Sequence, residues 1–184
     1  MTAIAAGSGS FSSSSNNEAA RTKAAALLQI GQILKAGVER LAGLGVDIDT
    51  INIDPTSTSN TNDLFAPAGG GVNAPAVTLA NSPVNDVWYY PLAAIPGLGS
   101  SNTERLAMLK VALDICNELN LRANAISTAA NDSSMTNDIG DVTTATLAGA
   151  VNWPTPLQGQ NSGCLHNSNS TTSGYFFYQV LGMR

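Results

Sequence analysis

Residues 18–41, EAARTKAAALLQIGQILKAGVERL, are the stretch that decides the fold. Apolar side chains recur in it every three or four positions, at Ala20, Ala24, Leu27, Ile30, Leu34, Val38 and Leu41. This spacing places them on one face of a helix, opposite Arg21, Gln32, Lys35 and Glu39. Ser15 and Glu18 have the spacing of a capping box, and glycines follow the last apolar residue, so we predict a long helix over residues 18–42.

Two glycines interrupt this predicted helix, Gly31 and Gly37. Each costs a helix interior about 1 kcal/mol relative to Ala. Because a glycine has no side chain, we expect another segment of chain to approach the helix closely at these positions.

Strands and a second helix are predicted after the long helix. Short strands are indicated at residues 46–53, 76–79 and 86–92, with one or two more within 143–153. Ser101 and Glu104 have capping-box spacing, and the apolar residues that follow predict a second helix from there to Leu119. Residues 174–181, GYFFYQVL, predict a strand at the centre of a sheet, because its aromatic side chains alternate onto both faces.

The order of these elements indicates an α+β fold, with the long helix packed on a small, mostly antiparallel sheet, a second helix and long loops. Residues 1–17 contain mainly Ala, Gly, Ser and Asn, so we expect a polar N-terminal arm there. Residues 18–184 form a single domain on this interpretation. The arm has neither the basic start nor the long apolar run of a signal peptide.

The composition favours an exported protein. Charged residues make up 11% of the chain, less than half the usual share, and Ser, Thr, Asn, Gly and Ala take their place. A net charge of −5 without a basic cluster disfavours nucleic-acid binding. No apolar stretch reaches the roughly 18 residues of a membrane helix, so we expect membrane contact only through an absent or truncated N-terminal segment.

Cys116 and Cys164 are the two cysteines of the chain. In an exported protein a disulfide between them is the natural expectation, and free buried thiols are the alternative. Cys116 lies on the apolar face of the predicted second helix, so the bond would tie that helix to the C-terminal region.

The candidate reactive residues are few. Asp47, Asp49 and Asp54 near one loop, and Asp132, Asp138 and Asp141 near another, could hold Ca²⁺, but neither group matches an EF-hand. We therefore favour solvated acidic loops and expect no cofactor. His166, the one histidine, follows Cys164 by two positions. One His and one Cys are too few ligands for a structural zinc site, and they are a weak candidate for a catalytic pair. We expect no enzymatic activity.

Four aromatic residues allow two interpretations. Trp88, Tyr89, Tyr90 and Trp153 could form a surface on which a sugar or another ligand stacks. We favour a place in the core, since large aromatic side chains are usually buried.

The chain resembles type IV pilins and pseudopilins, and more closely a family of small exported bacterial proteins with a pilin-like stalk. The resemblance rests on residues 18–41 of the first helix, on 67–72 and 113–120, and on 163–164 with 175–181 at the end. Pilins carry a prepilin cleavage site and an apolar helical half, and neither is present in this sequence. The resemblance implies a fold and a structural role but no activity.

The resulting functional hypothesis is a non-enzymatic structural subunit of an extracellular assembly, with a pilin-like filament first. A virion or coat protein and a secreted adhesion or ligand-binding module are the alternatives. The partners would be other copies of the chain. Small and apolar residues of the first helix would form the assembly surface, at Ala19, Ala20, Ala24, Leu27 and Gly31.

Overall fold

The computed structural model describes residues 10–78, 87–99, 104–126, 130–133, 153–167 and 173–183. Two helices, a sheet and one 3₁₀ turn are formed there. In chain order they are α1 (Ser10–Gly43), β1 (Trp88–Tyr89), β2 (Leu92–Ala93), β3 (Glu104–Val111), α2 (Leu113–Asn124), β4 (Ala130–Ser133), the 3₁₀ turn (Thr155–Leu157), β5 (Ser162–Asn167) and β6 (Gly174–Met183). The predicted α+β fold is confirmed.

The described strands form one sheet in the order β1-β3-β6-β5-β4, with β2 also pairing with β3. The pairings are antiparallel apart from β4 with β5, which is parallel. β6 lies between β3 and β5 and is buried from Phe176 to Leu181. The predicted strand at residues 174–181 is therefore confirmed, together with its central place in the sheet.

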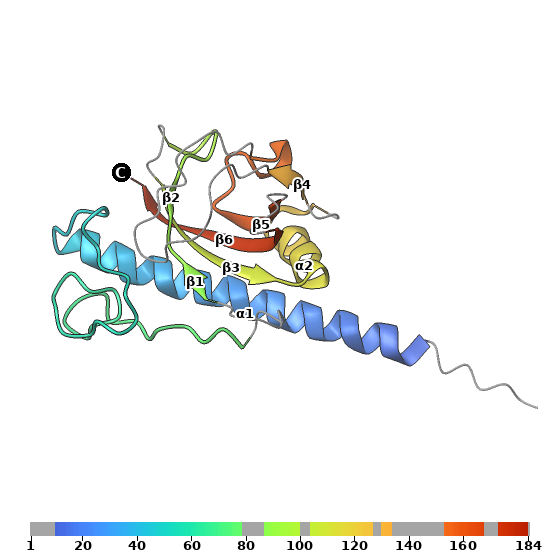
Figure 1. Ribbon diagram of the computed structural model, residues 1–184, viewed down its shortest axis with the longest axis horizontal. Coiled ribbons are helices and arrows are strands. Elements are labelled where there is room, and N and C mark those ends of the chain that lie inside the picture. Colours follow the sequence, from blue (N-terminus) through green and yellow to red (C-terminus); the bar gives the residue numbers. More distant parts are fainter. Residues whose placement is uncertain are drawn as a thin grey trace, which may run out of the picture.

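Helix α1 runs along one face of the sheet, and its N-terminal turns extend beyond it (Figure 1). Its 34 residues correspond to about 51 Å. The apolar stripe that the sequence predicted is the face that meets the core: Leu27, Leu34, Val38 and Leu41 are buried in one cluster with Phe177 of β6. Burying each such side chain contributes about 1.5–3 kcal/mol, so this stripe is a main source of stability.

The two glycines inside α1 make room for other segments, as expected. A Cβ at Gly31 would lie 2.9 Å from Cγ and Oε1 of Gln179 on β6. A Cβ at Gly37 would lie 2.8 Å from Leu64 and 2.9 Å from Val72, which belong to the loop after the helix. Both close approaches are made by the chain's own residues.

The opposite face of the sheet has a second core. Leu106 and Met108 of β3 and Phe176 and Tyr178 of β6 pack there against Trp153 and the 3₁₀ turn. The ring of Trp153 meets that of Tyr178 edge-on, with centroids 4.8 Å apart. Because both faces are covered, the central strands are apolar along almost their whole length.

The ends of α1 differ slightly from the prediction. The helix begins at Ser10, eight residues before the predicted start, and ends at Gly43. Residues 15–18 are therefore inside the helix and do not cap it, and part of the predicted 1–17 arm is helical. Thr22 donates a hydrogen bond from Oγ1 to the carbonyl of Glu18, 3.0 Å away, as residues inside a helix do.

The predicted start of the second helix is wrong. Residues 104–111 form β3, and α2 begins only at Leu113. Apolar side chains at Leu106 and Leu109 fit a helical period, but residues 104–109 are all buried because β3 lies between other strands. A short apolar run buried on both faces cannot be told from a buried helix by its periodicity. Residues 101–103 of the predicted capping box lie outside the described residues.

The strands predicted before β3 are confirmed only in part. Residues 86–92 contain β1 and the start of β2, which are separated near Pro91. Residues 46–53 are not a strand: the Asp47 carboxylate and carbonyl accept hydrogen bonds from Asp49 and Thr50 and form a turn there. Within the described residues 76–78 there is no strand either. Of the prediction at 143–153, only Trp153 lies inside the described residues.

Candidate assembly surface

The structure places the predicted assembly residues mostly inside the chain's own fold. Ala20, Ala24 and Leu27 are at most 2% exposed and belong to the core that includes α2 and the sheet. Gly31 is buried against β6. Ala19 is the one exposed member of the predicted set. The prediction of the other four as a contact surface is thus corrected: the apolar face that identified the helix is used within the subunit.

The outer face of α1 is exposed and mixes small and apolar residues with polar and charged ones such as Glu18, Gln29 and Arg40. Ala19, Ala25 and Ala36 are exposed, and so is Ile33, a large apolar residue that is 46% exposed. None of the helices in the described part of the chain is both long and apolar enough to cross a bilayer.

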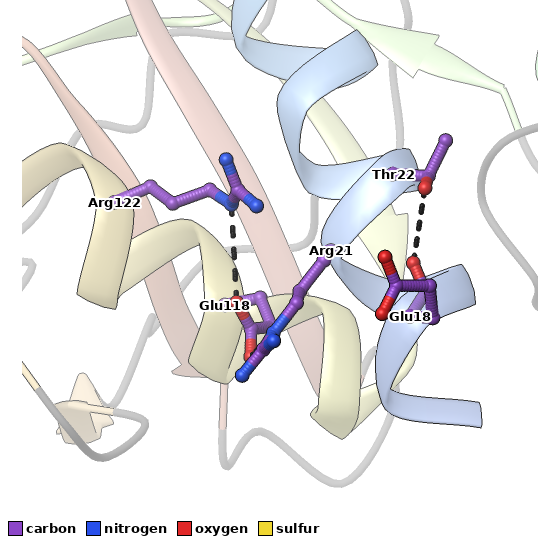
Figure 2. Close-up of polar contacts among 5 residues, drawn as sticks. All are labelled: Glu18, Arg21, Thr22, Glu118 and Arg122. Carbon is purple, nitrogen blue, oxygen red and sulfur yellow. Dashed lines mark hydrogen bonds and ion pairs between the residues drawn. The ribbon is translucent and has the colours of Figure 1, made fainter. Parts of the chain in front are cut away.

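A cluster of three charged side chains joins the N-terminal part of α1 to α2 (Figure 2). Arg21 of α1 and Arg122 of α2 approach the same carboxylate, that of Glu118: Nε of Arg21 lies 3.4 Å from Oε1, and Nε of Arg122 lies 3.8 Å from Oε2. The side chains of Arg21 and Arg122 are 53% and 42% exposed. Exposed ion pairs of this kind contribute about 0–1 kcal/mol to the free energy of unfolding, so the cluster adds little to the stability of the fold.

A disulfide and two amides hold α2 firmly on the sheet. Cys116 and Cys164 are bonded, with their Cα atoms 5.3 Å apart, as predicted. Asn120 makes two buried hydrogen bonds with the backbone of Cys164: Nδ2 donates to the carbonyl at 2.8 Å, and Oδ1 accepts from the N–H at 2.7 Å. One turn later, Nδ2 of Asn124 donates to the carbonyl of Ser162. Because α2 is fixed in this way, Glu118 and Arg122 have a defined position.

An open groove of about 530 Å³ lies at the other end of the α1–sheet contact. Lys35 and Glu39 of α1, which are paired at 3.8 Å, line it together with Asp47. Met183 at the end of β6 and Ala42 of α1 form its exposed apolar part. The groove therefore combines an excess of one negative charge with apolar surface.

Arg105 fixes the loop that carries Asp47. Its guanidinium group is buried and donates to the carbonyls of Tyr90 at 3.1 Å and of Ile48 and Asp49 at 3.5 Å. Burial lowers the pKa of this guanidinium, and the charge of Asp49 opposes that effect. The interactions are structural, and they hold one wall of the groove.

The acidic residues considered for Ca²⁺ stabilise loops in the described part of the chain. The pKa of the Asp54 carboxyl is lowered by hydrogen bonds from Thr56. Asp47 and Asp49 lie in the adjacent turn. Among the described residues, no group of three or more His, Cys, Asp or Glu side chains is arranged to hold a metal ion. Residues 138 and 141 lie outside the described residues, and the side chain of residue 132 is not described.

Asp63, which was not among the candidates from the sequence, organises the loop that follows Asp54. Its buried carboxylate accepts hydrogen bonds from the Asn60 N–H at 2.8 Å, the Ser57 hydroxyl at 2.8 Å, the Asn52 amide at 2.8 Å and the Ser59 N–H at 3.2 Å. The Asn60 hydrogen bond, with further hydrogen bonds from Ser57 and Asn52, lowers the pKa of Asp63 against the opposing effect of burial. Residues close in sequence supply all of these donors, so the carboxylate organises the loop.

The remaining candidates have structural positions. Cys164 is engaged in the disulfide, and His166 packs on the ring of Tyr175, with ring centroids 4.7 Å apart. The core interpretation of the aromatic residues is confirmed for Trp88, Tyr90 and Trp153, which are buried, while Tyr89 is half-buried.

Trp88 and Tyr90 also line an apolar cavity of about 200 Å³. Pro55, Ala74, Pro75, Val77 and Val87 complete its walls. Nε1 of Trp88 is buried and has no hydrogen-bond partner among the described residues.

No family model, curated protein or solved structure matches this chain.

Proposed function

We propose that this chain is a non-enzymatic structural subunit of an extracellular assembly, a filament of pilin-like type. The observation that carries the proposal is the form of α1. One face of the helix is buried on the sheet and α2, while its outer face is exposed and its N-terminal turns extend past the domain (Figure 1). A long helix with one fixed and one accessible face can join subunits side by side.

The other features support the same proposal. A disulfide across the α2–β5 contact suits an oxidising compartment outside the cytoplasm. The low content of charged residues suits close contact between identical copies, because each buried charge would need a partner. The buried ionisable residues Asp63 and Arg105 make hydrogen bonds that organise loops, which is a structural use.

A secreted ligand-binding module is the second candidate, and one observation favours it. The cavity beside Trp88 has apolar walls of the kind found in small-ligand sites. Binding of small apolar or sugar probes, followed by Trp fluorescence, would support this candidate if it were saturable and lost in W88F.

The filament proposal is tested in the source organism with antibodies against this chain. We expect the chain in sheared surface fibres by immunogold electron microscopy. Ala25→Glu, on the exposed face of α1, should leave the chain folded and exported but remove it from the fibres. Thr58→Glu, an equal charge change in an exposed loop, is the matched control and should leave fibres intact. A chain recovered only as soluble monomer would contradict the proposal.

A further inference from the structure

Two surfaces at opposite ends of the packed part of α1 have complementary properties. The first is the basic cluster, which we define as Arg21, Glu118 and Arg122 with the adjacent Leu121. The second is the acidic groove, lined by Lys35, Glu39, Asp47, Leu181 and Met183 among others. Arg21 and Glu39 are 18 positions apart on one helix, which corresponds to about 27 Å.

The basic cluster has donors left for a further carboxylate. Two guanidinium groups share the single carboxylate of Glu118, which leaves an excess of one positive charge. Each arginine faces Glu118 through Nε, so its Nη groups can form the paired hydrogen bonds that guanidinium makes with carboxylates (Figure 2). Leu121, next to Arg122, is 47% exposed and adds apolar surface.

The acidic groove offers the matching groups. Glu39 and Asp47 outnumber Lys35, and both acidic residues are exposed. Met183, which is 53% exposed, and the exposed Ala42 of α1 supply an apolar part against which a leucine can pack. Arg105 holds the loop of Asp47 from inside, so this surface is preformed.

We propose that the acidic groove of one copy of this chain binds the basic cluster of a second copy, with Arg122 and Arg21 facing Asp47 and Glu39, and Leu121 entering the apolar part. The two surfaces are different and lie at different ends of the subunit. Made once between each pair of copies, such a contact leaves one free surface at each end and repeats into a row of subunits, whereas an antiparallel pair that made it twice would close as a dimer. This inference rests on the proposed function, because it takes a second copy of the chain as the partner.

Other charges near these surfaces limit the strength of the contact. Glu18 and Asp114 lie on α1 and α2 near the basic cluster, and Lys35 lies in the groove. The contact should therefore be weak and sensitive to salt. The Debye length, over which charges are screened, is about 4 Å at 0.5 M salt and about 20 Å at 0.02 M salt.

Sedimentation velocity of the purified 184-residue chain tests the inference. We expect concentration-dependent self-association at 0.02 M NaCl that is lost at 0.5 M. R122Q should weaken it about three- to fivefold, and R21Q/R122Q about tenfold, from the usual size of exposed ion pairs. Q29E makes the same change of net charge as R122Q, at an exposed position of α1 outside both surfaces, and should have no such effect.

Mixing variants identifies the direction of the contact. R21Q/R122Q has an intact groove, and E39Q/D47N has an intact basic cluster, so neither should associate well alone. Their equimolar mixture should form dimers that do not grow, because one contact of each kind is restored. An isologous contact between like surfaces would not be restored by mixing, and that result would overturn the inference.

The remaining outcomes are also decisive. A wild-type chain that stays monomeric at 0.02 M NaCl up to millimolar concentration would overturn the inference, as would R21Q/R122Q associating like wild type. Folding of each variant is checked by circular dichroism. Filaments that form normally in cells carrying R21Q/R122Q would refute this contact while leaving the proposed function intact, whereas cells without filaments of the wild-type chain would refute the proposed function.

Discussion

Asn120 provides the sharpest test of how α2 is held on the sheet. Its side-chain amide takes the place of a neighbouring strand, because it both donates to the carbonyl and accepts from the N–H of Cys164. All of these atoms are buried. Asn120→Ala removes both hydrogen bonds and leaves two buried backbone groups without partners.

The magnitude follows from those two groups. An unsatisfied buried donor or acceptor costs about 1–3 kcal/mol, so we expect Asn120→Ala to lower the free energy of unfolding by about 3 kcal/mol. With a slope of about 2 kcal/mol per M urea, the unfolding midpoint should fall by about 1.5 M. Asn120→Leu fills the same space and should lose a similar amount, since the hydrogen bonds and not the volume decide the effect.

Urea unfolding followed by circular dichroism, with the disulfide intact, measures this effect. Asn117→Ala is the matched control on the same helix: its side chain is half-buried, and its Oδ1 has no partner among the described residues. We expect the control to change stability by less than about 0.5 kcal/mol. If Asn120→Ala unfolded within 0.5 kcal/mol of wild type, the argument that the amide substitutes for a strand would be wrong.

Three further predictions test the fold. Replacing Cys116 and Cys164 by Ser should cost about 4 kcal/mol in the chain-entropy model, and equal urea midpoints with and without the disulfide would contradict this. Gly31→Ala should destabilise the protein, although Ala favours helices, because the added Cβ has no room. Gly43→Ala should not destabilise it, because no atom lies within 4 Å of the added Cβ. Thermal unfolding of the two variants tests this difference. The lowered pKa of Asp63 means that its stabilisation is present above the ordinary carboxyl pKa and is lost as pH falls through the lowered value; unfolding of D63N, measured against pH, should lack this acid-sensitive part.

The sequence was most informative where periodicity or composition left one interpretation. Helix α1 has an apolar stripe sustained over more than 20 residues, and β6 has aromatic residues at successive positions, so both were predicted. The disulfide followed from there being two cysteines. Strand β5 was missed because SGCLHN has neither alternation nor a strong β-propensity, and its place is set by pairing with β6.

The contacts that position the candidate site were harder to predict from the sequence. Asn120 and Cys164 are 44 positions apart, and Arg21 and Glu118 are 97 apart, so nothing local connects them. Asp63 has its donors nearby, and the run of Ser, Thr and Asn before it is the signal that could have identified it.

The misplaced assembly residues have a single physical origin. An apolar helix face indicates burial but does not say whether the covering surface belongs to the same chain or to another. In α1 the chain's own sheet and α2 cover that face, and small residues such as Ala24 and Gly31 allow the close approach of those elements. A charged substitution at Ala24 would therefore unfold the subunit before it could report on assembly. On the proposals made above, contacts between copies would use surfaces that the described part of the fold leaves exposed, such as the outer side of α1, the basic cluster and the acidic groove. These carry more charge than the apolar stripe, so assembly through them should respond to salt, whereas the fold, held by buried apolar area and a disulfide, should not.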